Sequence, residues 1–107
     1  MPDRKPATAV LFAALGDETR LALVRRIAAG ESASITQLTE GSRLTRQAVT
    51  KHLRVLERAG LVRCTRQGRE CHYTLDPKPL MTMHEFLNKI SQQWDIALTR
   101  LQSLVEE

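Results

Sequence analysis

The sequence predicts a mainly α-helical domain with a small β-hairpin, arranged as a winged helix-turn-helix with about five helices. Three observations predict this fold. Residues 45–61 read as an amphipathic helix with a start and a stop, residues 34–44 as a short helix and a tight turn, and residues 61–75 as two strands. The chain of 107 residues suits one core, so we predict a single domain over residues 1–107.

The helix that begins at Thr45 has two different faces. Thr45 is placed to cap its first turn, and Gly60 offers the left-handed conformation with which helices commonly end. One face is apolar at helical spacing: Ala48, Val49, Leu53 and Leu56. The other face is polar and basic: Arg46, Gln47, Thr50, Lys51, Arg54 and Arg58. The first four of these lie in the opening two turns, where a helix in the major groove meets base edges, so we predict that they contact DNA bases.

A shorter helix precedes it. Ser34 and Gln37 have the spacing of a capping box, Leu38 follows, and residues 41–44 form a tight, glycine-containing connection. Two helices joined in this way are typical of a helix-turn-helix.

Two short strands follow the second helix. Residues 61–65 and 70–75 flank an arginine-rich tip, where Gly68 supplies a positive φ, and Tyr73 with Leu75 forms an apolar face directed at the helices. Such a basic hairpin is typical of a wing that touches DNA phosphates or the minor groove. The predicted DNA-backbone and wing contacts are Arg43, Arg54, Arg63, Arg66 and Arg69.

The charge is concentrated in this region. Residues 41–72 carry eight positive and two negative side chains, residues 1–40 five of each, and residues 73–107 three and five. The net charge of +4 therefore arises from a local +6, which indicates double-stranded DNA as the partner. The apolar run near residues 7–15 is short and charged residues follow it, so we expect no membrane association and a cytoplasmic location.

At this point the sequence resembles the ArsR-type bacterial winged-helix repressors, over roughly residues 7–101. The residues that carry the resemblance are 15–21 (LGDETRL), 48–53 (AVTKHL) with Leu56, 59–62 (AGLV), Gly68 with Arg69, and 73–75 (YTL). The resemblance implies a homodimeric, cytoplasmic transcriptional repressor. It also matches Arg46, Gln47, Thr50 and Lys51 to the family's base-contacting positions.

The last helix, predicted over residues 80–105, carries an apolar seam with alternating steps of three and four residues: Leu87, Ile90, Trp94, Ala97, Leu101 and Leu104. A helix of this length extends past a small head, so much of the seam needs a partner. We predict a homodimer in which this helix and the N-terminal helix over residues 7–15 pack with their symmetry mates. The predicted interface residues are Phe12, Leu87, Ile90, Trp94 and Leu101. Two heads would then bind an inverted-repeat operator.

The metal sites of the family have no counterpart here. Residues 35–39 contain no thiol, and the last helix offers only His84, Glu85 and Asp95, without the family's ligand spacing. We therefore expect no metal, no other cofactor and membership of a metal-independent branch. The sequence does not identify an inducer.

Cys64 and Cys71 lie on opposite arms of the hairpin and leave two interpretations open. A turn centred on residues 67–68 would pair residues 66/69, 65/70 and 64/71, which makes the two sulfur atoms neighbours. They would then form a disulfide or a soft-metal site with His72, as in a thiol- or metalloid-responsive repressor. The other interpretation is that both are small apolar side chains, since disulfides are uncommon in the cytosol.

Other classes of function fit less well. The sequence shows no spacing typical of a catalytic nucleophile and no phosphate-binding glycine loop, so we predict that it is not an enzyme. If the winged helix only docked proteins, nothing would explain why the residues at the start of the second helix are both polar and basic. His52 lies near the apolar edge of that helix, so we expect it to pack or to contact a phosphate rather than to sense pH.

Overall fold

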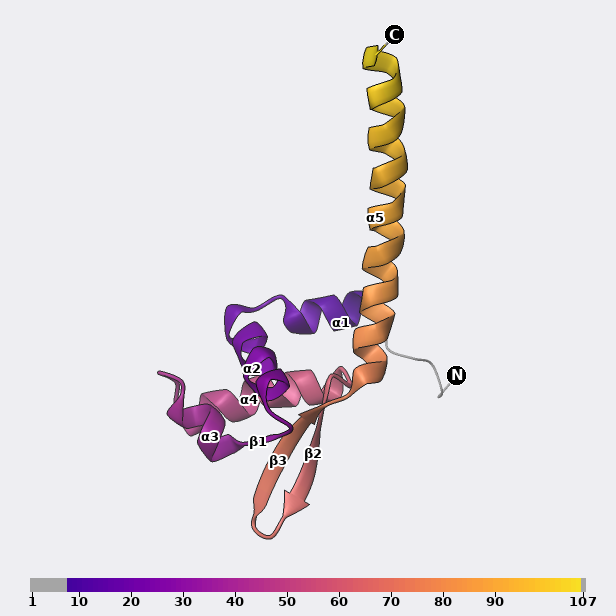
Figure 1. The fold of residues 1–107 in the computed structure, drawn as a ribbon. Coiled ribbons are helices and arrows are strands. Elements are labelled where there is room, and N and C mark those ends of the chain that lie inside the picture. The colour runs from indigo at the N-terminus through magenta and orange to yellow at the C-terminus, as the bar shows by residue number, and fades with distance from the viewer. Residues whose placement is uncertain (1–7, 107) are drawn as a thin grey trace.

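A computed structural model of the protein describes residues 8–106. The helices are α1 (Thr8–Leu15), α2 (Glu18–Ala29), α3 (Ile35–Glu40), α4 (Arg46–Arg58) and α5 (Pro77–Glu106), and the strands are β1 (Ala33–Ser34), β2 (Val62–Gln67) and β3 (Glu70–Leu75). Helices α1 to α4 and the sheet form a head, and most of α5 extends away from it (Figure 1). The predicted winged helix-turn-helix with five helices is confirmed. The outermost residues of the predicted domain, 1–7 and 107, lie outside the described part of the chain.

The sheet has three strands in the order β1-β3-β2, so the prediction of a two-stranded wing was incomplete. Strand β1 pairs antiparallel with β3, with Ala33 opposite Tyr73 and Ser34 opposite His72. A strand of two residues is too short to show alternation, and its partner lies about 40 residues away in the sequence. The strand lies at the base of the wing, directly before α3.

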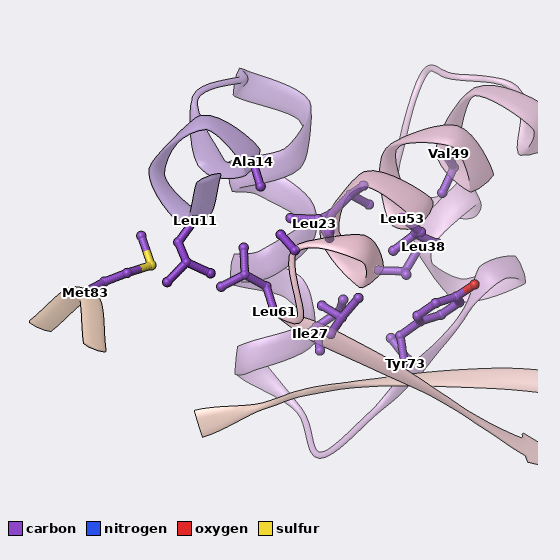
Figure 2. Close-up of a cluster of buried hydrophobic side chains, with 14 residues drawn as sticks. Leu11, Ala14, Leu23, Ile27, Leu38, Val49, Leu53, Leu61, Tyr73 and Met83 are labelled. Atoms are coloured by element: carbon purple, nitrogen blue, oxygen red, sulfur yellow. The ribbon is translucent and has the colours of Figure 1, made fainter. Parts of the chain in front are cut away.

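The core of the head lies where α1, α2, α4 and the sheet meet. In Figure 2, Met83 of α5 points toward Leu11 of α1, next to Leu61 at the start of the wing. The predicted core face of α4 is confirmed, because Val49, Leu53 and Leu56 are fully buried. Among residues 8–106, the buried apolar side chains are Leu11, Ala14, Leu23, Ile27, Ala33, Leu38, Val49, Leu53, Leu56, Ala59, Leu61, Val62, Tyr73 and Met83. Each fully buried leucine contributes about 1.5–3 kcal/mol, so this cluster holds α4 in place.

Both ends of α4 follow the sequence prediction. The Thr45 hydroxyl accepts a hydrogen bond from the backbone N–H of Ala48 (3.1 Å). At the other end Gly60 has a φ of 83°, its N–H donates to Glu57, and the N–H of Leu61 donates to Leu56. These bonds form a Schellman motif, which turns the chain from the helix into the wing.

We expect Gly60→Ala to destabilise the protein by about 1–2 kcal/mol, because a Cβ is disfavoured at this positive φ. No atom lies within 4 Å of the added Cβ, so the loss measures the backbone conformation alone. The matched control is Gly30→Ala, at an extended φ of −120° with its nearest atom 3.7 Å away. Urea unfolding at fixed protein concentration measures both variants. Equal losses in the two variants would contradict the explanation.

Helix α5 begins three residues before the predicted start at residue 80. Pro77 occupies its first position, where proline is tolerated because the N–H needs no partner. The Asp76 carboxylate accepts the backbone N–H of Lys78 (3.1 Å), and this bond, together with the Arg63 guanidinium, lowers the pKa of Asp76. At 30 residues, α5 is about 45 Å long. Within the described chain, no helix is long and apolar enough to cross a membrane.

Candidate nucleic-acid interface

The polar face of α4 is presented to solvent. Arg46, Gln47 and Lys51 are exposed and Thr50 is half-buried, while the opposite face of the helix lies in the core. A shallow depression runs along this surface and is lined by Thr45, Arg46, Gln47, Thr50, Lys51 and Arg54. All four side chains predicted to contact bases are therefore gathered on one open surface.

Two hydrogen bonds hold part of this surface in place. The Arg46 guanidinium donates through Nη1 to Oγ1 of Thr36 in α3 (3.1 Å), so the arginine bridges the two helices of the helix-turn-helix. The Thr50 hydroxyl donates to the carbonyl of Arg46 (2.8 Å), which leaves its lone pairs to accept from a donor outside the helix. Arg46 and Thr50 thus have defined orientations before any ligand is bound.

The predicted backbone-contacting arginines fall into two groups. Arg43, Arg54, Arg66 and Arg69 are exposed, on the turn before α4, on α4 and at the tip of the wing. Arg63 is exposed as well, but its Nη2 donates to the Asp76 carboxylate (3.0 Å) at the start of α5. This ion pair joins the wing to α5, and a phosphate would have to compete for the Arg63 guanidinium.

One structural residue near this surface, Arg26, was not identified from the sequence. Arg26 of α2 donates to the carbonyls of Leu38 and Gln37 (both 2.6 Å) and so caps the end of α3. Its guanidinium occupies the space that a Cβ at Gly41 would need. Gly41 is therefore required for this close approach and not for its φ, which is −85°. Only the glycine in the turn was a local sign of this contact.

The hairpin register differs from the predicted one. The turn consists of Gly68 and Arg69, with Gln67 opposite Glu70, so residues 64 and 71 are not directly opposed. Gly68 has a φ of 65° and is the first of the two loop residues, which is the position that a type II′ turn reserves for glycine. The prediction placed glycine second in the loop, and this shift of the turn by one residue moves the partner of every strand residue by two positions, from 71 to 73 for Cys64.

The two cysteines nevertheless meet. Cys64 lies opposite Tyr73, and Cys71 lies opposite Arg66, so the cysteines are diagonal neighbours on one face of the hairpin. Their Cα atoms are 5.6 Å apart and their sulfur atoms form a disulfide. Both are half-buried and pack against the core cluster. Within residues 8–106, no three His, Cys, Asp or Glu side chains gather as metal ligands.

Four of the five predicted dimer residues lie on α5, and Phe12 lies on α1. Leu87, Trp94 and Leu101 are exposed on α5, at 53%, 63% and 57% of their full accessibility, and Ile90 is half-buried. Phe12 of α1 contacts Phe86 of α5 within the same chain, with ring centroids 5.6 Å apart. This contact fixes α1 against the base of the protruding helix.

Comparison with known proteins agrees with this geometry. Residues 15–65 match the family described as a helix-turn-helix domain. The chain is 37% identical over 93 residues to the HTH-type transcriptional regulator Rv2034 of Mycobacterium tuberculosis. The aligned residues cover 87% of this chain and 83% of that protein. An ArsR-like transcriptional regulator from Rhodococcus sp. RHA1 superposes with a TM-score of 0.75 at 32% identity, over 91% of each chain.

The protein belongs to the ArsR-type helix-turn-helix transcriptional regulators. The family resemblance carried in part by residues 15–21 and 48–53 is thereby confirmed. A role in transcriptional regulation through DNA binding is confirmed as well. A further solved structure, described as the antimony-specific transcriptional repressor AntR, matches this regulator with a TM-score of 0.61 at 27% identity, over 89% of this chain and 93% of that one.

Proposed function

We propose that this regulator is a homodimeric repressor that binds an inverted-repeat operator, with α4 in the major groove and the wing beside it. The observation that carries the proposal is the exposed face of α4, where Arg46, Gln47, Thr50 and Lys51 gather opposite a fully buried face. Arginine and glutamine pair with base edges through two hydrogen bonds each, which is the basis of reading in the major groove. A bound dimer would block access of polymerase to the promoter, in the cytoplasm of a bacterial cell.

The arginines around this face provide the expected electrostatic part of the binding. Arg43 precedes α4, Arg54 follows the base-reading positions, and Arg66 and Arg69 lie at the wing tip. Contacts between such side chains and phosphates release counterions, so we expect the affinity for DNA to fall steeply with salt. Arg63 contributes less in this proposal, because Asp76 already holds its guanidinium.

The protruding helix supports the proposed dimer. Within Pro77–Glu106, only Met83 is buried, and the apolar side chains beyond the half-buried Ile90 are all exposed, up to 84% for Val105. The radius of gyration is 18.2 Å, against about 13 Å for a compact chain of this length. An isolated amphipathic helix of this kind is not stable in water without a surface to cover its stripe, and a second copy offers an identical stripe.

The size of the side chains favours antiparallel pairing of the two α5 helices. If the two-fold axis crosses between Trp94 and Ala97, each tryptophan packs on the small Ala97 of the partner subunit. Leu87 then meets Leu104 of the partner subunit, and Ile90 meets Leu101 of the partner subunit. The Trp94 and Ala97 layer then combines a large with a small side chain, whereas parallel pairing would oppose two tryptophans in one layer and two alanines in another.

The genome itself provides the direct test of this proposal. Purified protein would select bound duplexes from fragmented genomic DNA of its source at several salt concentrations, followed by sequencing. We expect one enriched inverted repeat. Binding without sequence preference would reject operator recognition and favour the alternative of a winged helix that docks other proteins.

The wing disulfide favours a second candidate, in which the repressor responds to thiol oxidation. Forming the bond removes two protons and two electrons from Cys64 and Cys71, and hydrogen peroxide would take them up to give two molecules of water. Because the bond joins β2 to β3, it restrains the hairpin that carries Arg66 and Arg69. The oxidised wing would then lose less conformational freedom on binding DNA.

We expect reduction of this disulfide to weaken operator binding by about tenfold, equivalent to about 1.4 kcal/mol. Fluorescence anisotropy with the selected operator, after treatment with peroxide or with a dithiol reductant, measures the difference. A Cys64→Ser/Cys71→Ser variant should bind equally well under both conditions. If the unmodified protein is also indifferent to the reductant, the two cysteines are only packing residues.

A further inference from the structure

A polar cluster joins α1 to α4 and takes no part in the proposed DNA surface. Its centre is the guanidinium of Arg20 in α2, within the 15–21 motif. Nε of Arg20 donates to the carbonyl of Ala14 (2.5 Å), and Nη2 donates to that of Ala13 (3.5 Å). Nη1 lies 3.3 Å from Nδ1 of His52, which accepts this bond when the imidazole proton is on Nε2. One side chain thus connects the end of α1 with the middle of α4.

Asp17 completes the cluster from the N-terminus of α2. Its carboxylate accepts the backbone N–H of Arg20 (3.0 Å) and lies 3.8 Å from Nδ1 of His52. The backbone bond, followed by the charge of Arg20, lowers the pKa of Asp17, so the carboxylate is ionised at neutral pH. The positive charge of Arg20 therefore has a fixed counter-charge beside it.

We infer that Arg20 is a positioning residue that fixes the angle of α4 relative to α1 and α5, the proposed dimerising helices. It thereby sets the spacing between half-sites that the dimer accepts. The inference rests on the proposed function. Helix α1 packs on α5 through Phe12 and Phe86, and Arg20 joins the last turn of α1, directly after Phe12, to His52 of α4. The placement of α1 and α5 in the dimer therefore constrains the orientation of α4 through the contacts of Arg20.

Apolar packing alone is a weaker determinant of this angle. The contacts of Leu11 and Ala14 with the core are non-directional, and similar apolar burial is compatible with a small rotation of the head. A guanidinium instead presents its donors in a rigid planar fork, and here the fork hydrogen-bonds two carbonyls and an imidazole at once. Lysine carries its three N–H donors on one nitrogen, so it cannot place them at the separate positions of Nε, Nη1 and Nη2.

Half-site spacing is sensitive to such an angle. One base-pair step displaces a half-site by about 3.4 Å and rotates it by about 35° around the duplex. Because the two heads move symmetrically about the two-fold axis, a small change in each head is doubled between them. A loosened connection would allow several spacings, while the base preference within each half-site remains.

The experiment measures the affinity for duplexes in which the two selected half-sites are moved apart or together by one and two base pairs. In the unmodified protein one spacing should dominate. For Arg20→Lys and Arg20→Gln, we expect the preference for that spacing over its neighbours to fall about tenfold. Arg25→Gln, an exposed arginine on the same helix, is the matched control and should retain the preference.

His52 provides an independent pair of variants that does not depend on the folding of the Arg20 variants. His52→Asn keeps an acceptor near the position of Nδ1 and should retain the spacing preference, whereas His52→Leu removes the acceptor and should lose it. Binding to a single half-site and thermal unfolding accompany each measurement.

Two results are distinguishable. If the Arg20 variants and His52→Leu bind more weakly by the same factor at every spacing, or no more weakly at all, Arg20 only stabilises the fold and the inference is overturned. If the unmodified protein selects no inverted repeat, the proposed operator binding fails, and the inference fails with it.

Discussion

Replacing Trp94 by alanine is expected to raise the dissociation constant of the proposed dimer by about a thousandfold. Each dimer contains two copies of Trp94, and a tryptophan at the centre of an interface contributes about 2 kcal/mol or more. Two copies give about 4 kcal/mol, which corresponds to three orders of magnitude. Because the side chain is 63% exposed within one chain, its loss should leave the head folded. Sedimentation equilibrium measures the constant, and far-ultraviolet circular dichroism checks the fold.

The matched control is Gln92→Ala, on the side of α5 away from the seam, which should leave the dimer unchanged. We expect the monomeric variant to lose most of its affinity for the inverted repeat, since one head alone can hold only one half-site. A Trp94→Ala protein that remains dimeric at micromolar concentration would show that the seam is not the interface.

Single cysteines test the direction of pairing. In a Cys64→Ser/Cys71→Ser background, Leu87→Cys and Leu104→Cys proteins would be mixed and oxidised. Antiparallel helices should cross-link only in the mixture, because each position faces the other one. Parallel helices would cross-link each variant to itself.

The elements predicted correctly from the sequence are those specified by neighbouring residues. The capping box of Ser34 and Gln37, the cap at Thr45 and the exit at Gly60 all lie within a few residues of the groups that they bind. The two faces of α4 follow from its periodicity for the same reason. The sequence therefore predicts which residues share the polar face of α4, but not how their side chains are oriented.

The features that sequence reasoning missed are long-range contacts. Arg20 meets His52 across 32 positions, Arg26 caps α3 from 11 and 12 positions away, and Arg63 meets Asp76 across 13. No periodicity brings such partners together, because their distance depends on how the helices pack. The hairpin register was missed for a different reason, since one glycine is compatible with two adjacent turn positions and only the folded strands distinguish them.

The second large effect concerns the reading surface itself. Arg46→Ala/Lys51→Ala is expected to lower the affinity for the selected operator by about a thousandfold or more. A good base contact discriminates by about 1–3 kcal/mol, and the double variant removes four side chains from each dimer. Anisotropy measurements with the operator and with a scrambled duplex of the same composition separate sequence reading from general attraction. The affinity for the scrambled duplex should fall much less, because the arginines of the wing remain.

Two further variants decide whether position or charge is responsible. Arg58→Ala removes an exposed positive charge from the last turn of α4, away from the proposed base contacts, and should keep the ratio of operator to scrambled affinity. Arg66→Ala/Arg69→Ala should weaken both duplexes alike and make the salt dependence shallower, by about 0.9 in slope for each phosphate that the wing no longer neutralises. If Arg46→Ala/Lys51→Ala also lowers both affinities equally, its side chains contact phosphates, and sequence reading must come from elsewhere on the head.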